Sequence, residues 1–203
     1  MIMVLPNKLN ITDPIALSIA EEKISKHNAK RLFETGALDA IPVGTFAGLA
    51  DIHRCLFGDI YDFAGKIRDV NIAKGSFRFA PVMHLQASLA HIDAMPQGTF
   101  DQIVEKYVEM NIAHPFREGN GRATRLWLDC LLKKETWQAV DWSLIAKDDY
   151  LSAMERSVVK DLEIKHLLKN ALTDTIHERA LFMRGLDASY HYEGYRHFRA
   201  EDV

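Results

Sequence analysis

Twelve consecutive residues, HPFREGNGRATR at 114–125, bring together a histidine, a glutamate, an asparagine between two glycines, and two arginines. Gly119, Asn120 and Gly121 stand where a loop enters a helix, because apolar residues at helical spacing follow them. Unpaired backbone N–H groups and the positive end of the helix dipole attract anions at such a junction. The two glycines also let a phosphate approach the backbone, so the stretch predicts a phosphate-binding loop.

The charged side chains around this loop indicate a polyphosphate and a metal ion. Arg122 and Arg125 lie three residues apart on one helix face, where two guanidiniums can hold further phosphate oxygens. Glu118 suits a Mg²⁺ that bridges phosphates through one carboxylate and several waters. His114 is the candidate proton acceptor, since an ordinary pKa of ~6.5 lets the neutral imidazole take a proton from an attacking hydroxyl.

Helices are predicted to position these residues. Apolar residues from Phe100 to Ile112 recur at helical spacing, and Pro115 disfavours the α conformation at His114, so this helix should stop there. The next helix should begin at the glycines and end near Lys134. Similar patterns predict further helices over 13–33, 46–63, 82–95, 143–155, 158–170 and 174–183, and a last one after Gly185, about 187–198, capped by Asp187 or Ser189.

One segment departs from the helical pattern. In KIRDVNIAKGSFRFAP, residues 66–81, apolar residues alternate on both sides of Gly75 and Ser76, which is typical of a short β-hairpin with a glycine turn. No other stretch gives a convincing strand signal. The sequence therefore predicts an all-α fold, a helical bundle with one hairpin at about 67–81, in a single domain covering 1–203.

Composition narrows the partners. The net charge of -3, with acids and bases interleaved, argues against a surface that coats nucleic acid or binds anionic membranes. No run of about 18 apolar residues and no leader pattern occur, so we expect a cytoplasmic protein. Cys55 and Cys130 fall within apolar helical patterns and are predicted to be buried free thiols, which fits a reducing compartment.

The twelve residues resemble the signature of the Fic family, His-x-Phe-x-Asp/Glu-Gly-Asn-Gly-Arg-x-x-Arg. The resemblance covers roughly residues 30–195 and implies a Fic-type helical bundle. It also implies transfer of AMP from ATP, with Mg²⁺, to a Tyr, Ser or Thr hydroxyl of a target protein, with release of pyrophosphate. Every specified position is filled here, by His114, Phe116, Glu118, Gly119, Asn120, Gly121, Arg122 and Arg125.

The resemblance implies a role for each of these residues. His114 would deprotonate the target hydroxyl, and Phe116 would anchor the loop in the core. The amides of residues 119–121 would hold the phosphates, with Mg²⁺ on Glu118. Arg125 would pair with the γ-phosphate, and Arg122 with phosphates or with the loop itself.

In relatives the hairpin forms a flap that aligns the target segment by strand addition, which tolerates varied sequences. Lys74 beside the turn is a candidate nucleotide contact, and an ordinary solvated lysine is the alternative. Tyr150 and Leu151 are candidates for the adenine pocket, because family members build it from that region. The flap residues here would be Gly75, Ser76, Phe77, Arg78 and Phe79.

A second motif, SYHYEG at 189–194, resembles the inhibitory Ser/Thr-x-x-x-Glu-Gly/Asn motif of autoinhibited family members. Ser189 and Glu193 share a helix face, and Gly194 leaves room beside the carboxylate. The resemblance implies that Glu193 pairs with Arg125, so that ATP binds with its α-phosphorus misplaced. Relatives of this type can regulate release through oligomerisation, so a homo-oligomer is expected.

Tyrosines beside the regulatory glutamate suggest self-modification. Releasing the helix would expose a hydroxyl that the enzyme modifies, and the added AMP would oppose redocking through bulk and charge. The acceptors on this hypothesis are Tyr190, Tyr192 and Tyr195.

Other activities on the same scaffold remain open from the sequence. Kinases of this family carry lysine in place of the second glycine, so Gly121 favours AMP transfer. Removal of AMP, with Glu193 activating water, is a second alternative, and a non-catalytic nucleotide-binding module is a third. The target is not encoded in any stretch of the chain, and relatives point first to a type II topoisomerase such as DNA gyrase.

Overall fold

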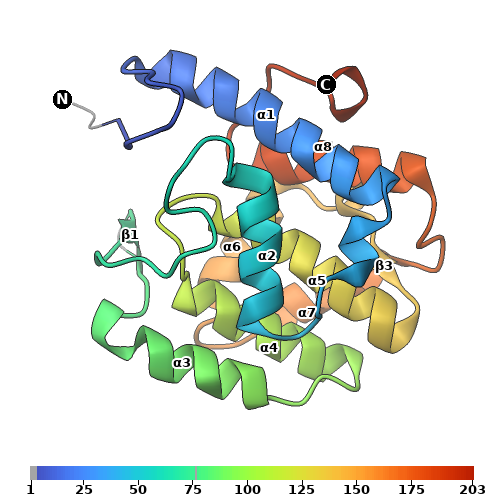
Figure 1. Ribbon diagram of the computed structural model, residues 1–203. Coiled ribbons are helices and arrows are strands. Elements are labelled where there is room, and N and C mark those ends of the chain that lie inside the picture. Colours follow the sequence, from blue (N-terminus) through green and yellow to red (C-terminus); the bar gives the residue numbers. More distant parts are fainter. Residues whose placement is uncertain (1–3, 76) are drawn as a thin grey trace.

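The computed structural model describes residues 4–75 and 77–203, which fold around a central helix, α5 (Asn120–Thr136). The helices packed against α5 include α4 (Phe100–Ala113), α2 (Phe46–Phe57) and α8 (Arg179–Tyr192). Figure 1 shows α1 (Pro14–Glu34) crossing one end of the molecule alongside α8. The other helices are α3 (Val82–Ala94), α6 (Lys147–Arg156) and α7 (Leu162–Asn170), with the short 3-10 turns η1 (Ala37–Ala40), η2 (Trp142–Leu144) and η3 (Ala200–Asp202).

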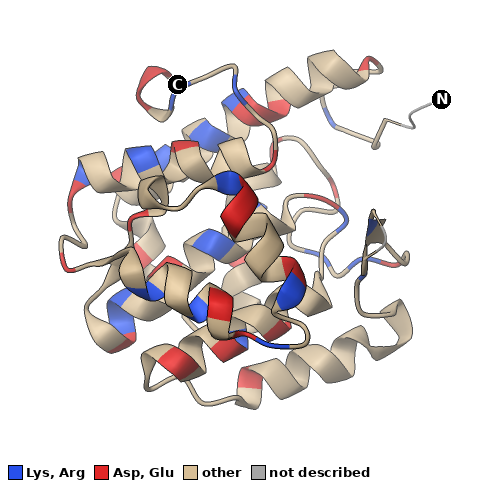
Figure 2. Ribbon diagram, turned by 180° about the vertical axis from the view of Figure 1, so that it is seen from behind, with Lys and Arg blue, Asp and Glu red and all other residues tan. Residues whose placement is uncertain are grey.

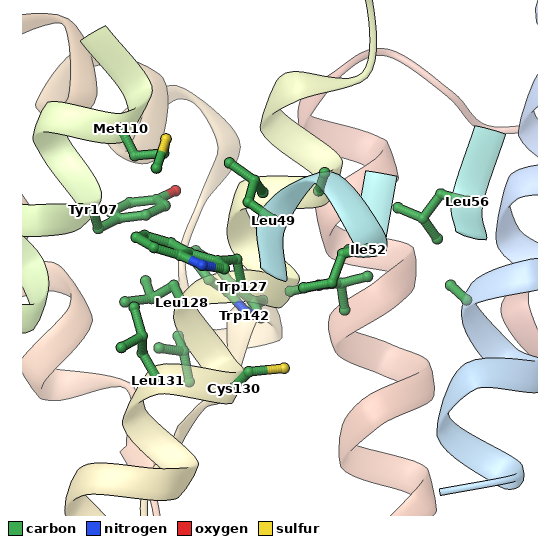
Figure 3. Packing of buried hydrophobic residues seen from close by; sticks show 14 of the residues in the cluster. Leu49, Ile52, Leu56, Tyr107, Met110, Trp127, Leu128, Cys130, Leu131 and Trp142 are labelled. Atoms are coloured by element: carbon green, nitrogen blue, oxygen red, sulfur yellow. The ribbon is translucent and has the colours of Figure 1, made fainter. Parts of the chain in front are cut away.

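The core lies around the buried face of α5. Trp127, Leu128 and Leu131 from this helix have no exposed surface, and they pack with Leu49 of α2 and Tyr107 of α4 (Figure 3). Burying a large apolar side chain fully contributes about 1.5–3 kcal/mol, so a few such residues hold α5 firmly. The helix that begins at the signature glycines is therefore a rigid base for the residues at its N-terminus.

The predicted hairpin is present in shortened form. Strands β1 (Ala73–Lys74) and β2 (Phe77–Arg78) pair antiparallel, with Lys74 opposite Phe77. Gly75 has φ +60°, a left-handed conformation that glycine adopts without a steric penalty. Ser76, the other turn residue of the prediction, lies outside the described residues. The hairpin stands at the edge of the helical body (Figure 1).

The all-α prediction with a hairpin is confirmed, and most helices lie where periodicity predicted them. A second antiparallel pair, β3 (Ala139–Val140) with β4 (Leu172–Thr173), was not predicted, because two-residue strands carry no periodic signal. Helix α2 ends at Phe57, six residues before the predicted Phe63, because the chain turns at Gly58.

The predicted break at Gly185 is wrong. Helix α8 runs unbroken from Arg179–Tyr192, so neither Asp187 nor Ser189 caps a separate helix over 187–198. Gly185 has no positive φ and lies within the helix, where a Cβ would make an ordinary contact at 3.4 Å with Cδ1 of Trp142.

Three further sequence predictions concern the two thiols, the surface charges and membrane-spanning helices. Cys130 is buried as predicted, whereas Cys55 is exposed, so that part of the thiol prediction is wrong because residue 55 faces outward on α2. In the view of Figure 2, acidic and basic residues are scattered over the same surface among other residues. Within residues 4–75 and 77–203, no helix combines the length and apolar character needed to cross a membrane.

Candidate active site

His114 ends α4 in the left-handed conformation, with φ 48° and ψ 62°. Its Nδ1 lies 3.1 Å from the Asn111 carbonyl oxygen, and a carbonyl only accepts, so Nδ1 carries the proton. Nε2 is thereby left as the proton-accepting nitrogen. The Phe79 ring of the hairpin stacks on the imidazole at 3.6 Å. Burial is the main reason that the His114 pKa falls to about 4, so the imidazole is neutral at physiological pH.

The loop after His114 is held from below by a second histidine. Phe116 is fully buried and stacks on His53 of α2 at 3.8 Å. The His53 Nδ1 accepts from the Gly65 N–H at 2.9 Å, and its Nε2–H donates to the Glu118 carbonyl at 2.8 Å. Burial lowers the pKa of His53 to about 4, which keeps it neutral. This role of His53 is not predicted from the sequence, where the residue is one member of an apolar helix face.

Two polar features shape the turn into α5. The Asn120 side chain accepts from the Phe116 N–H and donates to the Phe116 carbonyl, both at 2.8 Å, so it closes the loop and leaves its backbone N–H for an anion. Gly119 has φ +78°, and a Cβ there would lie 2.5 Å from the Phe57 ring. A Cβ at Gly121 would collide with the Glu193 carboxylate. Both glycines are therefore required for the close approach of other groups.

Arg122 joins the loop to the N-terminal helix. Its Nη1 lies 2.7 Å from the Glu21 carboxylate of α1, and its Nη2 lies 3.1 Å from Glu118. Glu21 also accepts hydrogen bonds from the Tyr61 and Tyr195 hydroxyls. The guanidinium is 1% exposed, and its Nε has no partner within the described part of the chain. Of the two roles predicted for Arg122, contact with the loop is the one this arrangement displays.

Arg125 is bonded to Ser189 of α8 and to Glu193, the first residue after that helix. The Ser189 hydroxyl accepts from Nε at 2.8 Å, and the Ser189 carbonyl accepts from Nη2 at 2.8 Å. Glu193 lies 2.8 Å from the same Nη2, while its other oxygen lies 3.4 Å from the Lys74 ammonium. Nη1 donates to the Tyr150 hydroxyl at 3.3 Å. Burial raises the pKa of Glu193, but Arg125 and Lys74 outweigh it and hold the pKa at about 2.

These groups meet in one cleft of about 800 Å³. The structure brings together the histidine, the signature loop, the hairpin and Glu193, although they come from distant parts of the sequence. Residues that the sequence analysis did not name also line it, among them Asn111, Arg117 and Met154. The predicted site residues in the lining are Lys74, Gly75, Phe77, Phe79, His114, Glu118, Gly119, Asn120, Gly121, Arg122, Arg125, Tyr150, Leu151, Glu193 and Tyr195.

The remaining candidates lie outside the lining. Ser189 is buried against Arg125, while Gly194 and Arg78 are exposed. The Tyr190 hydroxyl donates to Ser25 at 2.7 Å, and that of Tyr192 donates to two backbone carbonyls at 2.8 Å. Since the Tyr195 hydroxyl is bonded to Glu21, each of the three tyrosines is occupied while α8 is docked.

Glu118 is the residue that the sequence predicts as a magnesium ligand. Its side chain is 43% exposed, and Oε1 accepts from Arg122 and, at 2.9 Å, from the Gly119 N–H. No donor from residues 4–75 or 77–203 is bonded to Oε2, which fits a one-oxygen contact to Mg²⁺ completed by waters and phosphates. Across those same ranges, no group of three His, Cys, Asp or Glu side chains is arranged to hold a metal.

The structure is a helical protein in which the loop entering α5, the buried His114 and the hairpin meet in a single cleft. Residues 45–132 match the model of the Fic/DOC family. The chain is also 30% identical over 171 residues to the probable protein adenylyltransferase y4lH of Sinorhizobium fredii, covering 78% of this chain and 85% of that protein. The chain belongs to the Fic/DOC family.

A further relative and a solved structure are also similar to this chain. Identity to the protein adenylyltransferase VbhT of Bartonella schoenbuchensis is 29% over 199 residues, which cover 91% of this chain but only 40% of VbhT. The crystal structure of BepC from Bartonella tribocorum with bound AMPPNP shares the fold, with a TM-score of 0.67, 22% identity, and coverage of 84% of this chain and 92% of that one.

Proposed function

We propose that this chain is a protein adenylyltransferase that transfers AMP from ATP to a Tyr, Ser or Thr hydroxyl of a target protein. The observation that carries the proposal is the neutral His114, with Nε2 free to accept a proton, in the same cleft as the loop of residues 119–121. The enzyme class is that of curated relatives, which are 27–30% identical to this chain.

In the proposed reaction the hydroxyl oxygen attacks the α-phosphorus of ATP, and its proton moves to Nε2 of His114. The new O–P bond forms as the bond from the α-phosphorus to the oxygen bridging it to the β-phosphate breaks, so pyrophosphate leaves. The backbone N–H groups at the start of α5 would hold the phosphates. A Mg²⁺ on Glu118 would neutralise phosphate charge when bound.

The edge of the hairpin is suited to receiving the target. Phe79, directly after β2, stacks on His114, so a target strand added to the hairpin would lie close to the imidazole. Tyr150 and Leu151 on α6 border the same cleft and would enclose the adenine.

We further propose that Glu193 inhibits the reaction. Its carboxylate lies against Gly121 and pairs with Arg125, so it occupies both the loop surface and the guanidinium that would meet the γ-phosphate. ATP displaced by about 1 Å already loses ~100-fold in rate. Movement of residues 193–194 away from Arg125 would restore the productive position.

The test uses ATP labelled at the α-phosphate or at the γ-phosphate, in parallel reactions with purified DNA gyrase as the first candidate target. The parent chain is compared with Glu193→Gly and with Glu193→Gly/His114→Ala. We expect α-label on protein only with the single variant. Equal labelling by the parent and Glu193→Gly would remove the inhibitory role, and label from the γ-phosphate would establish a kinase.

The same samples address the other activities. Mass spectrometry of the Glu193→Gly chain tests AMP on Tyr190, Tyr192 or Tyr195, and a spectrum without it rules out self-modification at those sites.

Incubating a modified target without ATP tests removal of AMP, with free AMP as the supporting result. Nucleotide binding without any transfer would indicate a non-catalytic module.

A further inference from the structure

A buried arginine outside the signature connects the hairpin to the end of α4. Arg68, between α2 and β1, is 2% exposed and donates to four backbone carbonyls. On the α4 side its Nε lies 2.8 Å from the His114 oxygen, and its Nη2 lies 3.2 Å from that of Ala113. On the hairpin side the acceptors are Val70 at 2.7 Å and Ala80 at 2.5 Å.

The acceptors on α4 are groups that need partners. The last carbonyls of a helix have no intrahelical donor, and a cation at this end also meets the negative end of the helix dipole. The conformation of His114, with φ 48°, is uncommon for a residue other than glycine, so the turn depends on surrounding contacts. One further contact to this turn comes from the backbone N–H of Arg68, which donates to the Pro115 carbonyl at 2.8 Å.

Arg68 carries out this task at an electrostatic cost. It forms no ion pair with any carboxylate of the described residues, and burial lowers its pKa. An apolar side chain would be less costly to bury. Only a guanidinium, however, presents five donors in a planar fork that can reach several carbonyls at once.

We propose that Arg68 is a positioning residue for AMP transfer. By binding the carbonyls of residues 113 and 114 at the end of α4, and those of Val70 and Ala80 at the two ends of the hairpin, it holds the His114 turn and the hairpin together. The base and the surface that receives the target thereby keep their relative position. This inference rests on the proposed function for the roles of His114 and of the hairpin, while the contacts themselves do not depend on it.

Lys106 provides a matched control for the loss of a buried cation. It is 1% exposed and, like Arg68, is bonded within the described chain to carbonyl and amide oxygens rather than to a carboxylate. Its ammonium donates to the Met95 carbonyl at 3.1 Å and to the Gln97 side chain at 2.9 Å, in the connection between α3 and α4. None of these groups lines the cleft. Removing either cation should weaken the fold, but only Arg68 contacts the His114 turn.

The experiment compares Arg68→Met, Arg68→Lys and Lys106→Met, each in the Glu193→Gly background, at temperatures where all are folded. Two readouts are taken, the kcat and KM of α-label transfer and an NMR titration of the His114 imidazole. The titration needs no catalysis. With Glu193 absent, the charged groups that influence this imidazole are Lys74 on β1 and Arg68 itself.

We expect Arg68→Met to lose ~100-fold in kcat, as for a displacement of about 1 Å, and to raise the His114 pKa because a nearby cation is gone. Arg68→Lys should keep the pKa closer to that of its parent but still lose kcat, since one ammonium cannot reach all four carbonyls. Lys106→Met should leave both unchanged. Identical kcat and His114 pKa in Arg68→Met and Lys106→Met would overturn the inference, whereas absence of transfer from Glu193→Gly itself would refute the proposed function instead.

Discussion

Arg122 and Arg125 lie one turn apart on α5 and are equally buried, but their partners differ. The carboxylate that pairs with Arg122 is Glu21, 3% exposed in the middle of α1. The carboxylate that pairs with Arg125 is Glu193, 22% exposed and just beyond the last residue of α8. The first pair is part of the framework that holds the loop. The second lies at the end of α8, where the carboxylate is partly exposed.

The two pairs also differ in how much structure must move to separate them. Removing Glu21 from Arg122 would also break the contacts of Tyr61 and Tyr195. Among the described residues, the side chains bonded to Glu193 are Arg125 and, at 3.4 Å, Lys74, and the next residue, Gly194, is exposed with φ +95°. Under the proposed inhibition, the site would be regulated at the end of α8, while the pair of Arg122 with Glu21 would keep the loop in place.

The largest expected effect comes from Glu21→Gln, which leaves the buried Arg122 without its main charge partner. Breaking such a pair costs about 3–5 kcal/mol, measured as the free energy of unfolding in denaturant. Glu163→Gln, in the exposed pair with Arg156, is the control and should change little. Similar stabilities for the two variants would show that the Arg122 pair is not part of the framework.

The pH dependence of this stabilisation has a definite sign. Burial raises the pKa of Glu21, but Arg122 and hydrogen bonds to two tyrosines outweigh it, so the net change is a lowering. The stabilisation is therefore fully present above the unfolded-state pKa, near 4.5, and is lost as pH falls through the lower folded-state value. Unfolding of the parent and Glu21→Gln, followed from pH 7 downward, should converge in strong acid.

A second prediction concerns Glu193→Gly, which should raise α-label transfer by ~100-fold or more. Because the Glu193 pKa is about 2, protonation does not break the Arg125 pair between pH 5 and 8. Transfer by the parent chain should therefore stay low throughout that range. A steep rise in parental activity toward pH 5 would mean that the carboxylate titrates there and that the pair is weaker than the geometry indicates.

A third change, Phe79→Ala, exposes His114 without touching either arginine. Since burial is the main cause of the low His114 pKa, opening the stack should raise it from about 4 toward 6.5. In the Glu193→Gly background the acid limb of the rate profile should move to higher pH. NMR titration of the imidazole checks the assignment, and an unchanged pKa would mean that other groups bury the ring.

The smallest effect is expected from Lys74→Met. Lys74 is 66% exposed and lies 3.4 Å from Glu193, and exposed pairs of this kind contribute about 0.2–1 kcal/mol. Loss of the pair should increase basal transfer by the parent no more than ~5-fold. A larger increase would place more of the inhibition on the hairpin than on Arg125.

The sequence predicted those structural features that are determined by residues close together along the chain. The stop at His114 follows from Pro115, and the bend into α5 follows from Gly119, because both are local backbone preferences. The contact between Glu193 and Arg125 was predicted from the resemblance of residues 189–194 to the inhibitory motif of the family. The prediction failed at Gly185, because in the sequence a glycine inside a helix has the same appearance as one that ends a helix.

Three supporting residues could not be predicted in this way. Glu21, His53 and Arg68 contact the loop from 101, 65 and 46 positions away, respectively. In the sequence each is an ordinary member of a helix or a connection. Their functions depend on which segments meet in three dimensions, and no local pattern records that.

The proposed inhibition, in which Glu193 withholds Arg125 from the γ-phosphate, is tested most directly by calorimetric titration with ATP and ADP in the presence of Mg²⁺. The comparison uses His114→Ala and Glu193→Gly/His114→Ala, so that neither protein turns over. We expect the double variant to prefer ATP over ADP by ~10-fold or more, the contribution of a charge-assisted hydrogen bond, and the single variant to bind the two nucleotides alike. The same preference for ATP in both proteins would contradict the account.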